Sequence, residues 1–129
     1  MFKNCKNSKK QGDIGLGVAI SHFSCLGYTV LIPLTDSQDY DLAFDDGEKI
    51  NKVQVKTTSF KDSGENYAIT NLSVKGGNKS HYTTKVFDKN SVDYLFILTE
   101  RNEKYLIPTE SLNNKHQITL NEDRRQYLV

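Results

Sequence analysis

Hydrophobic positions along the chain change their spacing after the first quarter, which predicts one helix followed by several strands. Residues 11–26 carry apolar side chains at helical spacing over a wide face, and Gly27 marks the end of this helix. Residues 75–90 fit either a helix or an extended arm. Strands are predicted at residues 28–32, 39–44, 50–57, 67–70, 92–98, 104–107 and 118–120. This order predicts an α/β fold with a mixed β-sheet, in which the very hydrophobic strand 92–98 is central.

The second and third strands form a hairpin that brings three polar residues together. Large apolar residues fall at positions 40, 42 and 44, which leaves Asp41 on the other face. Valines alternate with polar residues in the next strand, so Gln54 and Lys56 share one face. If Asp45 pairs with Ile50 across the turn, Asp41 lies opposite Gln54, and side chains in such a pair are about 4.5–5.5 Å apart at Cβ.

These three residues have the chemistry that a metal-dependent phosphodiesterase requires. A carboxylate and an amide oxygen suit a hard cation, and an ammonium group beside them can orient the attacking water. The same alternation also fits the solvent-exposed face of an ordinary antiparallel sheet. The spacing alone leaves both interpretations open, because three polar residues on a hairpin are a weak motif.

Composition restricts the class of protein. A chain of 129 residues with 36% hydrophobic residues predicts one domain over residues 1–129, with a polar, flexible segment at 1–10. Cys5 and Cys25 show neither metal-ligand spacing nor a disulfide framework, so we expect a reducing, cytoplasmic environment. No run of residues is apolar enough for a membrane span, and no signal peptide is apparent. We expect no small-molecule cofactor.

The charges are unevenly distributed although the net charge is only +1. Lysines crowd the N-terminus and recur around the glycines at 76 and 77, whereas acidic residues gather between positions 36 and 48. Lys75, Lys79 and Tyr82 fit a DNA-contacting loop, because glycines let backbone amides approach phosphate. The same residues also fit an ordinary hairpin tip.

Six short segments, taken in order, resemble the PD-(D/E)XK endonucleases, and within them the single-domain group related to intron-encoded homing endonucleases of bacteria. They are residues 11–15 (QGDIG), 26–33 (LGYTVLIP), 40–42 (YDL), 53–57 (VQVKT), 92–94 (VDY) and 105–108 (YLIP). The resemblance implies a restriction-endonuclease-like core, with a mixed β-sheet flanked by helices.

The resemblance also implies an active site and a substrate. Asp41, the Gln54 side-chain oxygen and the Val55 backbone carbonyl would bind Mg²⁺ (or Mn²⁺), and Lys56 would orient or activate the water. Gln54 stands where most members carry an acid, so we expect weaker Mg²⁺ binding. The expected substrate is double-stranded DNA, cleaved at a specific site. The residues that we assign to DNA contacts are Lys10, Thr57, Lys75, Lys79 and Tyr82.

One departure from the pattern bears on activity. Relatives commonly carry Gly-Glu in the first helix, where this chain has Gly15-Leu16. Asp13 lies one turn earlier and is the candidate replacement; it also fits a first-turn acid that stabilises the helix N-terminus. The departure therefore favours a weakened or inactive nuclease, or a catalytically silent DNA-binding module of the same fold. A structure-specific junction nuclease with the same chemistry is a further alternative. Because specific DNA interfaces bury about 1,000–2,500 Å² and often read two half-sites, we expect a homodimer or a dimer of dimers.

Overall fold

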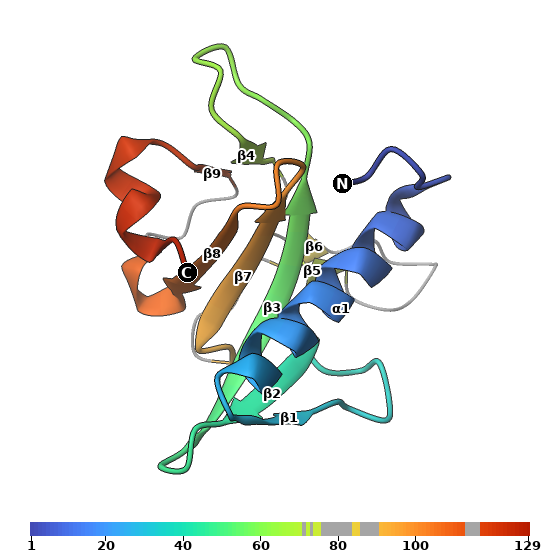
Figure 1. Cartoon of the computed structure of the whole chain (residues 1–129), viewed down its shortest axis with the longest axis vertical. Helices are drawn as coiled ribbons and strands as arrows, with labels where there is room; N and C mark the ends of the chain where they lie inside the picture. Colours follow the sequence, from blue (N-terminus) through green and yellow to red (C-terminus); the bar gives the residue numbers. More distant parts are fainter. Residues whose placement is uncertain (71, 73, 76–83, 86–90, 113–116) are drawn as a thin grey trace.

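A single five-stranded sheet with one long helix on one face organises the protein (Figure 1). The computed structural model describes residues 1–70, 72, 74–75, 84–85, 91–112 and 117–129. The helix α1 spans Ser8–Cys25. The sheet has the order β1-β2-β3-β7-β8. Its strands are β1 (Thr29–Leu31), β2 (Leu42–Asp45), β3 (Ile50–Thr58), β7 (Tyr94–Thr99) and β8 (Lys104–Pro108).

Smaller elements surround this sheet. Two-stranded sheets are formed by β4 (Ala68–Ile69) with β9 (Ile118–Thr119), and by β5 (Val74–Lys75) with β6 (Thr84–Lys85). Two 3₁₀ helices follow β8 and β9, namely η1 (Thr109–Ser111) and η2 (Glu122–Tyr127). In the described part of the chain, no helix is long and apolar enough to cross a membrane.

The sheet is mixed, as the sequence predicts. Strands β3 and β7 are parallel, and the other three neighbouring pairs are antiparallel. The apolar run 95–98 in β7 is fully buried, because both faces of this strand are covered. This confirms the α/β class. The most hydrophobic strand, β7, is an interior strand of the sheet, whereas the middle position that we predicted for it belongs to β3.

The two faces of the sheet have separate cores. On the α1 side, the helix packs through Ala19 and Phe23 against side chains of β2, β3 and β7. On the other side, Leu95 and Ile97 pack against residues of β4, β8 and β9. The sheet is therefore covered by α1 on one face and by short strands and loops on the other.

The position of Tyr40 differs from the predicted hairpin. The alternation placed its ring on the same face as Leu42 and Phe44, but this is wrong: Tyr40 packs against the opposite core. The backbone bends at Asp41 before β2 begins at Leu42, which ends the alternation. The Tyr40 ring instead lies 5.5 Å from the Lys52 ammonium.

The helix begins earlier than predicted. The Asn7 side chain accepts a hydrogen bond from the Lys10 backbone N–H at 2.9 Å, which caps the helix so that it begins at Ser8 rather than near Gln11. Before it, Phe2 packs in the α1-side core with 7% exposure. Residues 1–10, which we expected to be flexible, thus contribute to both the helix and the core.

Candidate active site

The site forms at the end of the β2–β3 pairing, where β3 continues beyond β2. Asp45 pairs with Ile50 and Leu42 pairs with Val53, which confirms the predicted register. Continuing this register places Asp41 opposite Gln54, and the Gln54 Nε2 donates a hydrogen bond to Asp41 Oδ2 at 2.9 Å. The Asp41 carboxylate is therefore held on β3 by a contact between two side chains 13 residues apart.

The backbone of Val55 completes this contact. Its N–H donates to the same Asp41 Oδ2 at 2.7 Å. Even-numbered residues of β3 bond to the β7 side, since the carbonyls of Lys52 and Thr58 accept from Asp93 and Glu100. The N–H and C=O of one residue in an extended strand point to the same side. The Val55 carbonyl therefore points into the gap that Asp41 occupies, where no described strand pairs with it.

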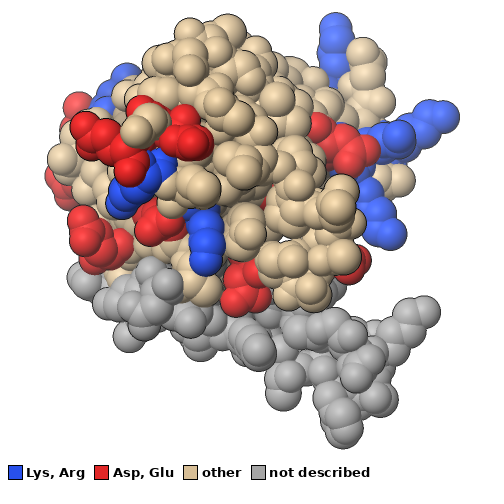
Figure 2. All heavy atoms as spheres, turned by 90° about the horizontal axis from the view of Figure 1, so that it is seen from below, with Lys and Arg blue, Asp and Glu red and all other residues tan. Residues whose placement is uncertain are grey.

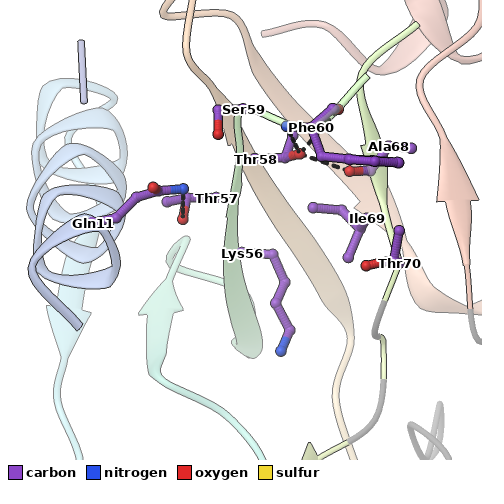
Figure 3. Close-up of a pocket in the computed structure, with 9 residues that line it drawn as sticks. All are labelled: Gln11, Lys56, Thr57, Thr58, Ser59, Phe60, Ala68, Ile69 and Thr70. Atoms are coloured by element: carbon purple, nitrogen blue, oxygen red, sulfur yellow. Dashed lines mark hydrogen bonds between the residues drawn. The ribbon is translucent and has the colours of Figure 1, made fainter. Parts of the chain in front are cut away.

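Lys56 lies on the same face of β3 as Gln54, and its side chain points away from α1 (Figure 3). Within the described residues its ammonium group makes no hydrogen bond and no ion pair shorter than 4.0 Å. Burial lowers the pKa of Lys56, and the negative charge of Asp41 offsets part of this shift. The result is an available, partly desolvated ammonium group close to a carboxylate.

Asp41 shows the complementary effect. Partial burial raises its pKa, while the Val55 N–H and the Lys56 charge act in the opposite direction. Its Oδ2 accepts both hydrogen bonds described above, and its Oδ1 accepts none from the described part of the chain. One carboxylate oxygen is thus fixed to β3, and the other has no partner among the described residues and could bind a cation.

The donor set fits a hard divalent cation. The available oxygens are Asp41 Oδ1, the Val55 carbonyl and, once the amide turns by 180°, Gln54 Oε1. Mg²⁺ commonly binds through one or two carboxylates, with water and substrate phosphate completing the shell. The described residues contain no group of three or more His, Cys, Asp or Glu that could hold a metal ion. A zinc-type site is therefore not formed there, whereas a single-carboxylate Mg²⁺ site is compatible.

The helix residues considered as further ligands lie elsewhere. The Asp13 side chain is 73% exposed and approaches Lys10 Nζ at 4.0 Å. Successive helical residues are about 100° apart, so Asp13 points away from Gly15, which faces β3. Asp13 is also in the second turn rather than the first, because the helix begins at Ser8. Leu16 packs against the α1-side core and supplies no oxygen.

A pocket of about 280 Å³ adjoins Lys56 at the far end of β3 (Figure 3). Its lining residues come from α1, β3 and the segment through β4: Gln11, Lys56, Thr57, Thr58, Ser59, Phe60, Ala68, Ile69 and Thr70. Gln11 Nε2 donates to Thr57 Oγ1 at 3.0 Å, so this helix side chain is fixed on the strand. Thr57, assigned above to DNA contacts, is therefore part of the pocket wall.

The remaining pocket residues have weaker signals in the sequence. Gln11 could have been found from its position one turn before Gly15, on the helix face that meets β3. Ser59, Phe60 and Thr70 had no such signal, because only the tertiary fold brings β4 to β3. Lys79 and Tyr82 lie outside the described residues. Lys75 lies in β5, but its side chain is not described.

Surface charge is mixed near the hairpin end of the molecule. Figure 2 shows this face with acidic side chains spread across it and basic side chains projecting mainly at one side. Among the described residues seen there, no continuous basic surface forms. Carboxylates on the described part of this face would repel a phosphate backbone.

Comparison with known proteins gives a consistent result. The family model described as PD-(D/E)XK endonuclease matches residues 6–127. Among solved structures, the bacterial homing endonuclease I-Ssp6803I is 30% identical with a TM-score of 0.74, over 93% of this chain and 82% of that one. The Holliday junction resolvase Hjc of Archaeoglobus fulgidus shares the fold at 9% identity and a TM-score of 0.59, over 92% and 90%. No curated protein sequence matched.

Proposed function

The chain belongs to the PD-(D/E)XK endonuclease family, and from this premise we propose that it hydrolyses phosphodiester bonds of double-stranded DNA with Mg²⁺ (or Mn²⁺). One observation supports this most strongly. The Asp41 carboxylate, the Gln54 amide and the Val55 backbone meet where β3 extends beyond β2, next to a Lys56 ammonium group that has no hydrogen-bond or ion-pair partner among the described residues.

Each residue has a distinct task in this proposal. Asp41, Gln54 and Val55 would hold the cation through the three oxygens described above. A bound divalent cation would stabilise the negative charge that develops on the phosphate and lower the pKa of bound water. Gln54 contributes no charge, so the site depends on the single carboxylate of Asp41 and on the substrate phosphate.

Lys56 would act on the attacking water and on the phosphate. The pKa of Lys56 is lowered toward neutral pH by burial, and this makes proton exchange with water easier. In its charged form, it donates hydrogen bonds to a phosphate oxygen as negative charge accumulates there. Among the described residues its ammonium group makes no hydrogen bond, so neither role requires a described contact to break.

We further propose site-specific, homing-type cleavage by a homodimer or a dimer of dimers. The 30% identity with I-Ssp6803I supports the homing-type assignment. Cleavage of both DNA strands requires two active sites, and one site per chain therefore favours a pair of chains. An interface large enough for specific recognition points in the same direction.

The test is a plasmid-nicking assay with and without Mg²⁺. Asp41→Asn should lower the Mg²⁺-dependent rate by about 100-fold or more, since it removes the only charged ligand. Glu48→Gln is the matched control, because Glu48 lies exposed in the turn of the same hairpin and loses the same charge. Thermal melting should show that both variants fold. Equal cleavage by Asp41→Asn and Glu48→Gln would contradict the proposed site.

The same assay separates the alternatives. A silent DNA-binding module would retard DNA in a gel but never nick it, with or without Mg²⁺. A junction nuclease would cleave a four-way junction and spare a linear duplex with the same arm sequences. The homing-type proposal instead expects cleavage of linear duplex at a preferred sequence, which sequencing of the cut ends would identify.

A further inference from the structure

Phe60 is unusual among the apolar residues of this protein because its ring is exposed beside the active site. Its exposure is 53%, and it is the one aromatic residue among the exposed large hydrophobics of the described chain. A single exposed apolar side chain is common on protein surfaces and has no meaning by itself. What distinguishes Phe60 is its position at the rim of the pocket that Lys56 also lines.

The backbone holds Phe60 firmly in this position. Its N–H donates to Thr58 Oγ1 at 3.1 Å, and its carbonyl accepts from the Ala68 N–H at 3.0 Å. The Thr58 hydroxyl, itself buried, donates to the Ala68 carbonyl at 2.6 Å and so ties β3 to β4. The ring therefore stands on a backbone that is fixed at both its N–H and its C=O.

The pocket below the ring suits a nucleotide. In Figure 3, Phe60 closes one end near Ala68, Lys56 extends toward the other end, and Ile69 and Thr70 lie between them. Among the described residues, the lining contains hydroxyl and amide groups, one ammonium group and no acidic side chain. A phosphate near Lys56 would meet the positive charge of its ammonium group, and the Phe60 ring lies further along the same wall.

We propose that Phe60 is a stacking platform for an unpaired base of the DNA, a few nucleotides at most from the phosphodiester at Lys56. This inference rests on the proposed function, because it takes the Lys56 site as the place of cleavage. Phe60 is four positions along the chain from Lys56, and four extended steps span at most about 14 Å. The base must be unpaired, because a base inside a duplex has both faces covered by its neighbours.

A single tryptophan provides a direct probe, since the chain contains none. Phe60→Trp places an indole at the pocket rim, and Ile50→Trp is the matched control at the other end of β3, where Ile50 is 55% exposed. Both proteins are titrated with a single-stranded oligonucleotide in EDTA, and indole emission is recorded. We expect quenching of Phe60→Trp but not of Ile50→Trp. No quenching, or equal quenching of both, would overturn the proposal.

Affinity measurements add a second, independent readout. Base–aromatic stacking predicts that Phe60→Ala weakens binding of the oligonucleotide about 5- to 150-fold. Phe60→Tyr should bind the oligonucleotide about as tightly as the unmodified chain. Phe60→Leu should bind as weakly as Phe60→Ala, because Leu is apolar but has no ring. Binding by Phe60→Leu as tight as that of the unmodified chain would overturn stacking.

Because these titrations contain EDTA, they do not depend on cleavage. Failure of the proposed function would appear separately, as an unmodified chain that does not nick DNA in Mg²⁺. Failure of the stacking proposal would appear as an active nuclease whose oligonucleotide binding is unaffected by Phe60→Ala.

Discussion

Gly15→Ala tests how the helix sets the position of the catalytic strand. The helix approaches β3 so closely at Gly15 that an added Cβ would lie 2.5 Å from Thr57 Cγ2 and 3.3 Å from Val55 Cγ1. Overpacking of this kind typically costs about 1–3 kcal/mol. Replacing a helical glycine with alanine otherwise gains up to about 1 kcal/mol.

Gly12→Ala is the matched control, because an added Cβ at this position has nothing within 4 Å. It should raise the free energy of unfolding by about 0.5–1 kcal/mol. The free energies of unfolding of the two variants should therefore differ by about 1–3 kcal/mol, with Gly15→Ala the less stable. Urea denaturation with a shared m-value measures this difference directly.

A second substitution identifies the contact responsible. Thr57→Ser removes Cγ2, the closer of the two clashing atoms, and keeps the hydroxyl that accepts the Gln11 hydrogen bond. In the Gly15→Ala background it should recover most of the lost stability. Cleavage should follow the same order, because Val55 and Thr57 flank Lys56 and a displaced β3 moves the ammonium group. If Gly15→Ala is as stable as Gly12→Ala, the close packing of α1 on β3 is refuted.

Three further predictions concern the site itself. Lys56→Ala should reduce the single-turnover cleavage rate about 10²–10⁴-fold with a much smaller loss of DNA affinity; a proportional loss of affinity would make Lys56 only a phosphate contact. Gln54→Glu places a second carboxyl group beside Asp41 and should raise the folded-state pKa of this pair further above its unfolded value, so the pair's contribution to metal-free stability, measured against the unmodified chain, should be fully present below about pH 4 and be lost as the pH rises through the raised pKa. Urea titrations at acid and neutral pH should show this loss and its reversal by Mg²⁺; a flat profile contradicts it. Leu16→Glu should increase cleavage and lower the free energy of unfolding by about 1–2 kcal/mol, since Leu16 is partly buried; unchanged cleavage would show that this helix position supplies no ligand.

The sequence predicted the hairpin of the active site well, because local chemistry determines it. The turn residues between Asp45 and Ile50 set the pairing, and the register then places Asp41 opposite Gln54 without any information from the rest of the chain. The apolar run of β7 predicted an interior strand for a similar reason, since a strand covered on both faces must be hydrophobic throughout, although the middle of the sheet is β3.

Other features depend on contacts that no local pattern records. The bend at Asp41 sends Tyr40 to the opposite face, which strict alternation could not reveal. The start of the helix was missed because the residues that follow Asn7 are polar and did not suggest a helix. The Asn7 side chain nevertheless caps this segment and stabilises its first turn. The pocket at Phe60 requires β4 to pack beside β3, a contact between segments that only the tertiary structure brings together.

The central claim is that Asp41 holds a divalent cation with help from Gln54 and Val55. Anomalous diffraction from a crystal soaked in Mn²⁺ tests it most directly, because the ion is located without reference to activity. We predict a Mn²⁺ peak in contact with Asp41 Oδ1 and the Val55 carbonyl, with the Gln54 amide turned so that its oxygen faces the ion. A well-occupied Mn²⁺ site elsewhere, with the Gln54 Nε2 to Asp41 Oδ2 hydrogen bond still in place and no peak beside it, would contradict the account.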